Sequence, residues 1–172
     1  MPVKSVQDLF VEELRDIHSA ERQLTKALPR MAKAAQSPQL RQAFERHLKE
    51  TEGQIERLDR IFKELDARAT GKRCKGMEGL LEEGKEMMEE EGDASVIDAG
   101  LISAAQRVEH YEIAAYGCVR NYADMLGYKN AARLLQQNLD EEEAADKKLT
   151  ELAEGGVNSA AMAAAGSQDE EE

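Results

Sequence analysis

The sequence predicts an all-α fold, a four-helix bundle with one long crossover that contains a short extra helix. Three observations lead to this prediction. Apolar residues recur at helical spacing in four long blocks. The composition, with no Trp, 3 Phe, 4 Tyr and only 3 Pro, favours helices. A long segment separates the second block from the third, and 172 residues are enough for one domain.

The first two blocks are expected to form an antiparallel pair. The first runs from Val6 to Ala35, and Ser5 followed three residues later by Asp8 resembles a capping box at its start. Ser37 can cap the second block, Pro38 to Asp66, and proline is favoured at the first helical position. A turn this short forces two long helices to run in opposite directions.

The crossover and the second pair follow. Residues 67–76 contain two glycines and four basic residues and are typical of a loop, whereas Met77 to Glu91 has the pattern of a short amphipathic helix. The third block runs from Ala94 to Leu126 and the fourth from Lys129 to Glu154, each ending at glycine. Two antiparallel pairs joined by a long connection form the ferritin-like arrangement. We expect a bundle domain over residues 1–155 and a flexible acidic tail over 156–172.

The net charge of −12, from 23 Lys plus Arg and 35 Asp plus Glu, argues against a nucleic-acid-binding protein. It also argues against docking on an anionic membrane, and no apolar run approaches the roughly 20 residues of a membrane span. Two cysteines are too few for a disulfide framework. We therefore expect a cytoplasmic protein.

Several carboxylates lie in line with the apolar stripes of the helices, so they are expected to point into the bundle. A buried carboxylate is unfavourable by several kcal/mol unless it is paired or bound to a cation. Oxygen ligands from four helices at similar depth are typical of a two-metal site. The predicted ligands, all on inward faces, are Glu21, Glu50, Gln54, Glu109, Glu112, Glu143 and Asp146.

One position in this set stays open, because a small rotation of the fourth helix would replace Glu143 with Glu142. The set also differs from the usual di-iron pattern, in which two helices each carry Glu-x-x-His. Gln54 and Asp146 occupy comparable places, and Glu109 is additional. His47 precedes Glu50, the reverse of the usual order, and is expected to support a ligand rather than bind metal.

The sequence resembles the bacterial YciF-type stress-response proteins, a ferritin-like family, over nearly the whole chain except the tail. The matching segments are DLF at 8–10, SAERQL at 19–24, HLKET at 47–51, QIER at 54–57, AAQRVEHYEIA at 104–114, LGY at 126–128 and LDEE at 139–142. The resemblance implies a ferritin-like bundle that forms a homodimer and holds a dinuclear metal centre. Its implied ligands are the seven residues predicted above.

Charge counting favours two metal ions, Fe or Mn, because six carboxylates balance two trivalent ions. The leading functional hypothesis is a stress-response protein that reduces O2 or peroxide at this centre. The first alternative is a non-enzymatic helical bundle with a structural or interaction role. The second is iron storage, which requires a cage that a dimer does not provide.

Overall fold

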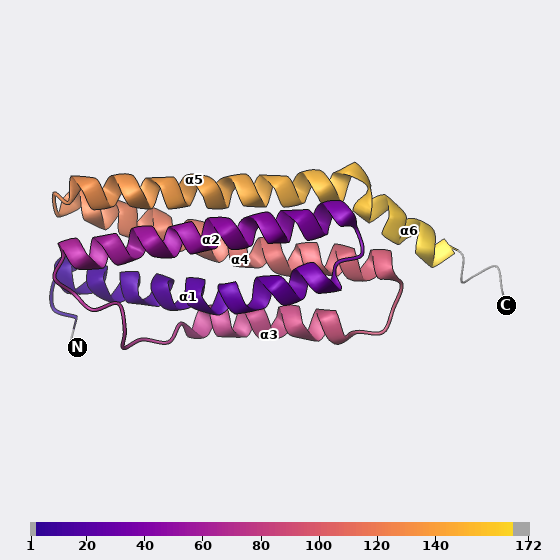
Figure 1. Ribbon diagram of the computed structural model, residues 1–172, viewed down its shortest axis with the longest axis horizontal. Helices are drawn as coiled ribbons and strands as arrows, with labels where there is room; N and C mark the ends of the chain where they lie inside the picture. The colour runs from indigo at the N-terminus through magenta and orange to yellow at the C-terminus, as the bar shows by residue number, and fades with distance from the viewer. Residues whose placement is uncertain (1–2, 167–172) are drawn as a thin grey trace.

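The computed structural model describes residues 3–166, and every regular element in that range is a helix (Figure 1). The predicted bundle with a crossover helix is confirmed. The four long helices and the crossover helix end within two residues of the predicted positions. The elements in chain order are α1 (Val6–Ala34), α2 (Pro38–Glu64), α3 (Lys75–Glu89), α4 (Ala94–Met125), α5 (Lys129–Leu152), a π-helical turn (Ala153–Val157) and α6 (Asn158–Gly166).

The four long helices lie side by side along the long axis of the molecule (Figure 1). Helix α1 packs against α2 and α4, and α5 packs against α2 and α4, so the bundle has four sides. Helix α3 lies outside this bundle and packs against α1 and α4. The crossover therefore runs along one face of the bundle, and the opposite pair, α2 and α5, has no covering helix among the described residues.

The helix ends have the caps that the sequence predicts. The Ser5 side chain accepts a hydrogen bond from the Asp8 backbone N–H at 3.1 Å, and its hydroxyl donates to the Asp8 carboxylate at 2.9 Å. The Ser37 hydroxyl accepts from the Leu40 backbone N–H at 3.4 Å. Gly127 has φ +80°, a left-handed conformation that glycine adopts without strain and that ends α4.

A buried carboxylate on α4 holds the turn between α1 and α2. The side chain of Asp98 is 3% exposed and accepts hydrogen bonds from the backbone N–H groups of Gln36 at 2.8 Å and Ser37 at 2.7 Å. These donors lie at the start of α2, where the helix dipole favours a negative charge. Asp98 therefore ties the first helical pair to the second.

Replacing Asp98 with alanine is expected to lower the free energy of unfolding by about 2 kcal/mol, because two backbone donors at the start of α2 lose a charged acceptor. Urea unfolding followed by circular dichroism measures this loss. The matched change at the exposed Asp124 is expected to have an effect below about 0.5 kcal/mol. Equal losses at the two positions would contradict this role of Asp98.

The apolar core is divided into two clusters, one toward each end of the bundle. One cluster contains Leu28, Leu40 and Leu101, and the other contains Leu14, Leu58 and Leu135, among others. Buried polar side chains from α1, α2, α4 and α5 occupy the levels between the two clusters. This central polar layer separates the two apolar clusters along the described bundle helices.

The chain remains helical beyond the predicted end of the bundle domain. Gly156 has φ +155°, and the π-helical turn that contains it bends the chain into α6. Helix α6 packs against α4, so residues 158–166 are helical where the sequence suggests a flexible tail. The acidic residues of that tail, 169–172, lie outside the described residues.

Across residues 3–166, no helix combines the length and the apolar character that a bilayer span requires.

Candidate metal centre

The central polar layer is made of side chains that ordinarily lie in water. Each is at most 5% exposed, and together they come from all four bundle helices. Full burial of this many ionisable groups is unfavourable unless something compensates the charge. The members are Glu21 from α1, His47 and Gln54 from α2, Glu109 and Glu112 from α4, and Glu142 from α5.

Four of these residues converge closely enough to share one ion. His47, Glu109, Glu112 and Glu142 each offer a ligand atom, and these atoms all lie within 4.8 Å of one another. The Nε2 atom of His47 is 3.3 Å from Oε1 of Glu109 and 3.6 Å from Oε2 of Glu142. Imidazole and carboxylate together are a common ligand set for Fe, Mn and Zn.

The donor atoms in this layer have few protein partners. Both carboxylate oxygens of Glu112 and of Glu142 lack a hydrogen bond within the described protein, as does one oxygen each of Glu21 and Glu109. Both side-chain polar atoms of Gln54 are also unpaired. Buried polar atoms are almost always hydrogen-bonded, so an unpaired group of this size indicates a missing partner. A cation fits this role, because every unpaired carboxylate oxygen is a donor to metal.

The electrostatics of the layer are consistent with this interpretation. Burial raises the pKa of Glu21, Glu109 and Glu112 well above the usual value, and neighbouring carboxylates raise it further. The charge of Glu142 contributes to all three increases. Burial opposes protonation of His47, yet the nearby carboxylates, first Glu50 and then Glu142, hold its pKa above the usual value. The layer therefore attracts positive charge.

Four of the seven predicted ligands, Glu21, Gln54, Glu109 and Glu112, lie in the central polar layer. Glu50 lies at its edge, with 22% of its side chain exposed, where it pairs with Arg46 at 2.8 Å. The proximity of His47, followed by the bond to Arg46, lowers the pKa of Glu50. Glu50 is thus a carboxylate on the rim between the polar layer and solvent.

The prediction for α5 is wrong at Glu143, which is exposed, whereas the alternative Glu142 is fully buried. Asp146 is also outside the converging group. Its carboxylate accepts a hydrogen bond from the Gln106 side chain at 3.1 Å and lies 3.3 Å from the His110 ring, with 22% of its side chain exposed. Asp146 has protein partners, so the structure gives it no unsatisfied donor atom.

Contacts between α2 and α5 fix the rotation of α5 about its own axis, which decides that Glu142 and not Glu143 faces the bundle interior. The Arg57 guanidinium donates two hydrogen bonds to Glu141, at 2.7 and 2.9 Å, and one to the Asn138 side chain at 2.8 Å. The side-chain amide of Asn138 in turn donates to the backbone carbonyl of Gln54 at 3.4 Å. Because Glu141 is held toward α2, the following residue, Glu142, points into the bundle.

Sequence reasoning underestimated two residues. Glu142 is one heptad from the buried Leu135 and one from the buried Leu149, so its phase on α5 was a usable signal. His47 faces the carboxylates across the bundle, and it is likewise one heptad from the buried Leu40 and one from the buried Gln54, so the same signal placed it on the inward face of α2. Tyr116 is fully buried, and its hydroxyl donates a hydrogen bond to Glu21.

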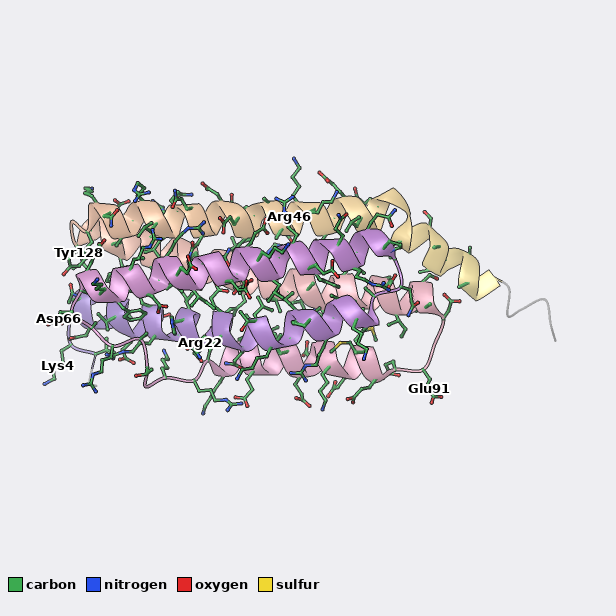
Figure 2. The ribbon with its side chains drawn as sticks, viewed as in Figure 1. Lys4, Arg22, Arg46, Asp66, Glu91 and Tyr128 are labelled. Carbon is green, nitrogen blue, oxygen red and sulfur yellow. The ribbon has the colours of Figure 1, made fainter. Side chains whose placement is uncertain are left out.

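A cavity of about 230 Å³ between α2 and α5 leads to this layer. His47, Glu50 and Glu109 line it on the side of the polar layer, and Ala144 and Ala145 of α5 form part of its wall. Arg46, labelled in Figure 2, also lines it, and its side chain is 74% exposed. Ions and small molecules therefore have a route to the buried donors from the uncovered side of the bundle.

Comparisons with known proteins agree with this architecture. Residues 5–162 match the family described as "Domain of unknown function (DUF892)". The chain is 48% identical to the protein YciF of Escherichia coli over 159 residues, which cover 92% of this chain and 96% of YciF. The crystal structure of that E. coli stress protein superposes with a TM-score of 0.88 over 91% of this chain and 99% of YciF.

A second solved structure is also similar. YcfI from Rhodopseudomonas palustris, for which a structural role has been suggested, is 44% identical. It superposes with a TM-score of 0.83 over 86% of this chain and 94% of its own. The family match and these similarities extend over the helices that supply the central polar layer. The chain therefore belongs to the DUF892 family, the family of the bacterial YciF-type stress proteins.

Proposed function

We propose that this protein is a ferritin-like stress protein whose central polar layer binds two metal ions, Fe or Mn, and reduces O2 or peroxide. The observation that carries the proposal is the set of buried, converging donors without protein partners. Inward carboxylates on facing helices are the arrangement in which bundle proteins hold two metals.

The charge of the layer supports a redox pair of ions. The carboxylates of Glu21, Glu50, Glu109, Glu112 and Glu142 carry −5 when ionised, one fewer than the sequence predicts because Asp146 is bound elsewhere. Two divalent ions carry +4 and two trivalent ions carry +6. The donor set is therefore close to neutral in either oxidation state. When bound, such ions supply the electrons that reduce O2 or peroxide.

The chain's own residues prepare the site for this chemistry. Tyr116 donates its hydroxyl to Glu21 and holds one carboxylate oxygen in place. Glu50, on the rim, lies 3.6 Å from His47 on the inner side and is bonded to Arg46 on the solvent side. Its carboxylate can therefore pair with either side chain. The apolar clusters above and below exclude water, and the cavity between α2 and α5 admits small oxidants.

Reconstitution with Fe²⁺ under anaerobic conditions, followed by addition of O2 or hydrogen peroxide, tests the proposal. We expect two ions per chain and oxidant consumption faster than that of free Fe²⁺. The Glu112→Ala variant is expected to lose this activity, because it removes two buried oxygens that have no hydrogen-bond partner in the described protein and are free to bind metal. Glu143→Ala, on the exposed face of α5, is the matched control. Fewer than two ions per chain in the wild type would contradict the proposal.

A non-enzymatic structural role is the second candidate, favoured by the role suggested for the Rhodopseudomonas palustris relative. In that case the buried carboxylates would remain protonated, and the reconstituted protein would consume no oxidant.

As part of the first proposal we include a homodimer, as the family resemblance implies, and light scattering of the purified protein measures it. A dimer would exclude bulk iron storage, because storage requires a closed cage.

A further inference from the structure

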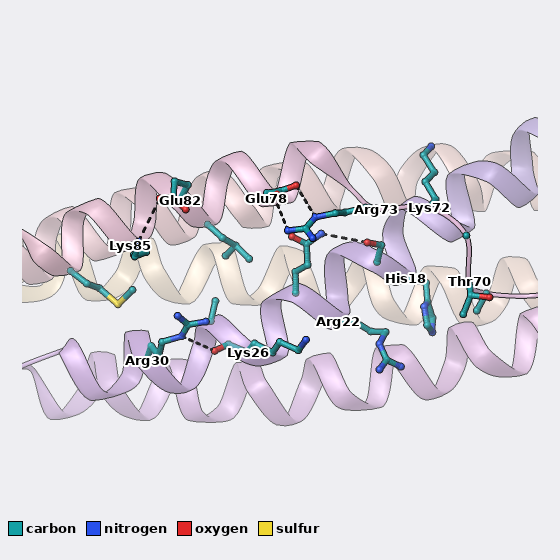
Figure 3. Close-up of a pocket in the computed structure, with 17 residues that line it drawn as sticks. His18, Arg22, Lys26, Arg30, Thr70, Lys72, Arg73, Glu78, Glu82 and Lys85 are labelled. Atoms are coloured by element: carbon teal, nitrogen blue, oxygen red, sulfur yellow. Dashed lines mark hydrogen bonds and ion pairs between the residues drawn. The ribbon is translucent and has the colours of Figure 1, made fainter.

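We propose that a basic groove on the crossover side of the bundle binds a compact, linear polyphosphate, either free or as part of a nucleotide. The groove lies between α1, the loop before α3, and α3 itself, and its volume is about 670 Å³ (Figure 3). It is separate from the cavity that leads to the central polar layer, and the inference does not depend on the proposed metal chemistry.

The charge of the groove is opposite to that of the protein. The chain has a net charge of −12, yet basic side chains outnumber the acidic ones that line this groove, Glu78 and Glu82. These acids are already paired, with Arg73 at 2.7 Å and Lys85 at 3.6 Å respectively. The basic residues are Arg22, Lys26, Arg30, Lys72, Arg73 and Lys85.

Three of the cations form a row along α1. Arg22, Lys26 and Arg30 follow one another at intervals of four residues, so they lie on one face over about 12 Å. Like charges at this spacing repel one another, and none of the three forms a salt bridge with any residue in the described range. An anionic ligand would remove this repulsion.

The loop on the other side of the groove is held in place. The Arg15 guanidinium donates to the carbonyl of Arg68 at 2.9 Å, at one end of the loop. At the other end, the Cys74 N–H donates to the Ser19 hydroxyl at 3.0 Å and the Gln23 amide donates to the Cys74 carbonyl at 3.0 Å. Lys72 and Arg73 therefore extend from an anchored segment, which reduces the entropy that a ligand must overcome.

The composition of the groove favours a phosphate chain. Arginine binds phosphate oxygens through two parallel hydrogen bonds, and a row of cations requires a ligand with several charges. No Phe, Tyr or Trp of the described residues lines the groove, and the imidazole of His18 is the one aromatic ring there on which a base could stack. A long nucleic acid would extend onto the acidic surface beyond the groove, where it would be repelled.

Titration calorimetry of the full chain with sodium tripolyphosphate, in buffer without divalent metal, tests this inference. The double variant Arg22→Gln, Lys26→Gln is expected to raise Kd at least tenfold. Both side chains are exposed and outside salt bridges, so its melting temperature should equal that of the wild type. Lys49→Gln, at an exposed position on α2, is the matched control and is expected to leave Kd within about twofold.

ATP titrated in parallel distinguishes the two sources of the phosphate chain. Tighter binding of ATP than of tripolyphosphate would support a nucleotide, and equal affinity or tighter binding of tripolyphosphate would support the free chain. The same titration of Glu142→Ala is expected to give the wild-type Kd, because that residue lies in the central polar layer. The inference would be overturned by no binding at about 1 mM tripolyphosphate, by an equal loss in Lys49→Gln, or by tighter binding of a hexaglutamate peptide.

Discussion

Replacing Glu142 with alanine is expected to lower the affinity for Fe²⁺ or Mn²⁺ at least a hundredfold, whereas the same change at Glu143 leaves it unchanged. The two residues are adjacent and chemically identical, but Glu142 is fully buried and Glu143 is exposed. Both oxygens of Glu142 lack protein partners, and one lies 3.6 Å from His47. Loss of one ligand from a preformed site accounts for an effect of this size.

Metal content after reconstitution, measured by atomic emission, and titration with Mn²⁺ give the two affinities. Glu142→Gln keeps the shape of the side chain and removes its charge, so it separates loss of charge from loss of packing. Equal affinities of the Glu142→Ala and Glu143→Ala variants would show that α5 contributes no ligand at this position. A loss in the Glu143 variant alone would mean that α5 is rotated relative to the arrangement described above.

The thermal stability of the metal-free protein is expected to fall as the pH rises from about 5 to 8. In the unfolded chain the carboxyl groups of Glu21, Glu109 and Glu112 titrate near 4.5, whereas burial raises their pKa in the folded protein. Above pH 4.5 the folded state therefore binds more protons than the unfolded state, and the free energy of unfolding decreases with pH. The raised pKa of His47 acts in the same direction.

Metal is expected to reverse this trend, because ligands bind metal in their deprotonated form and affinity rises with pH. At a free metal concentration of 100 times Kd, the melting temperature should rise by roughly 5–10 °C. Scanning calorimetry at several pH values, with and without Mn²⁺, measures both effects. Glu112→Gln removes one titrating group and is expected to flatten the metal-free trend. A melting temperature that rises with pH in the absence of metal would contradict the pKa directions given above.

The fold could be predicted from sequence because its signals are local and repeated. Ser5, Ser37 and Gly127 mark helix ends, and each behaves in the structure as its residue type predicts. The long segment between the helical pairs decided the topology. The helical structure after Gly156 was not predictable in the same way, because residues 157–166 carry little large apolar surface and reach their contacts with α4 only because the chain bends at Gly156.

The sequence predicts which face of each helix points toward the site, but it does not identify every residue that lies there. Glu21, Glu109 and Glu112 coincide in phase with apolar neighbours, and the structure buries all three. On α5 the choice between Glu142 and Glu143 depends on a rotation of one residue, about 100°, which the Arg57 contact to Glu141 determines. That contact joins residues 84 positions apart, so no local pattern contains it.

The division of the core into two apolar clusters separates the parts of the molecule that hold it together from the part that we propose reacts. Each cluster joins all four long helices at its own level, so the helices remain aligned whatever occupies the level between them. Substitutions in the central polar layer can therefore change metal preference or abolish binding without loss of the scaffold. The architecture allows the chemistry to diverge among relatives that share one fold.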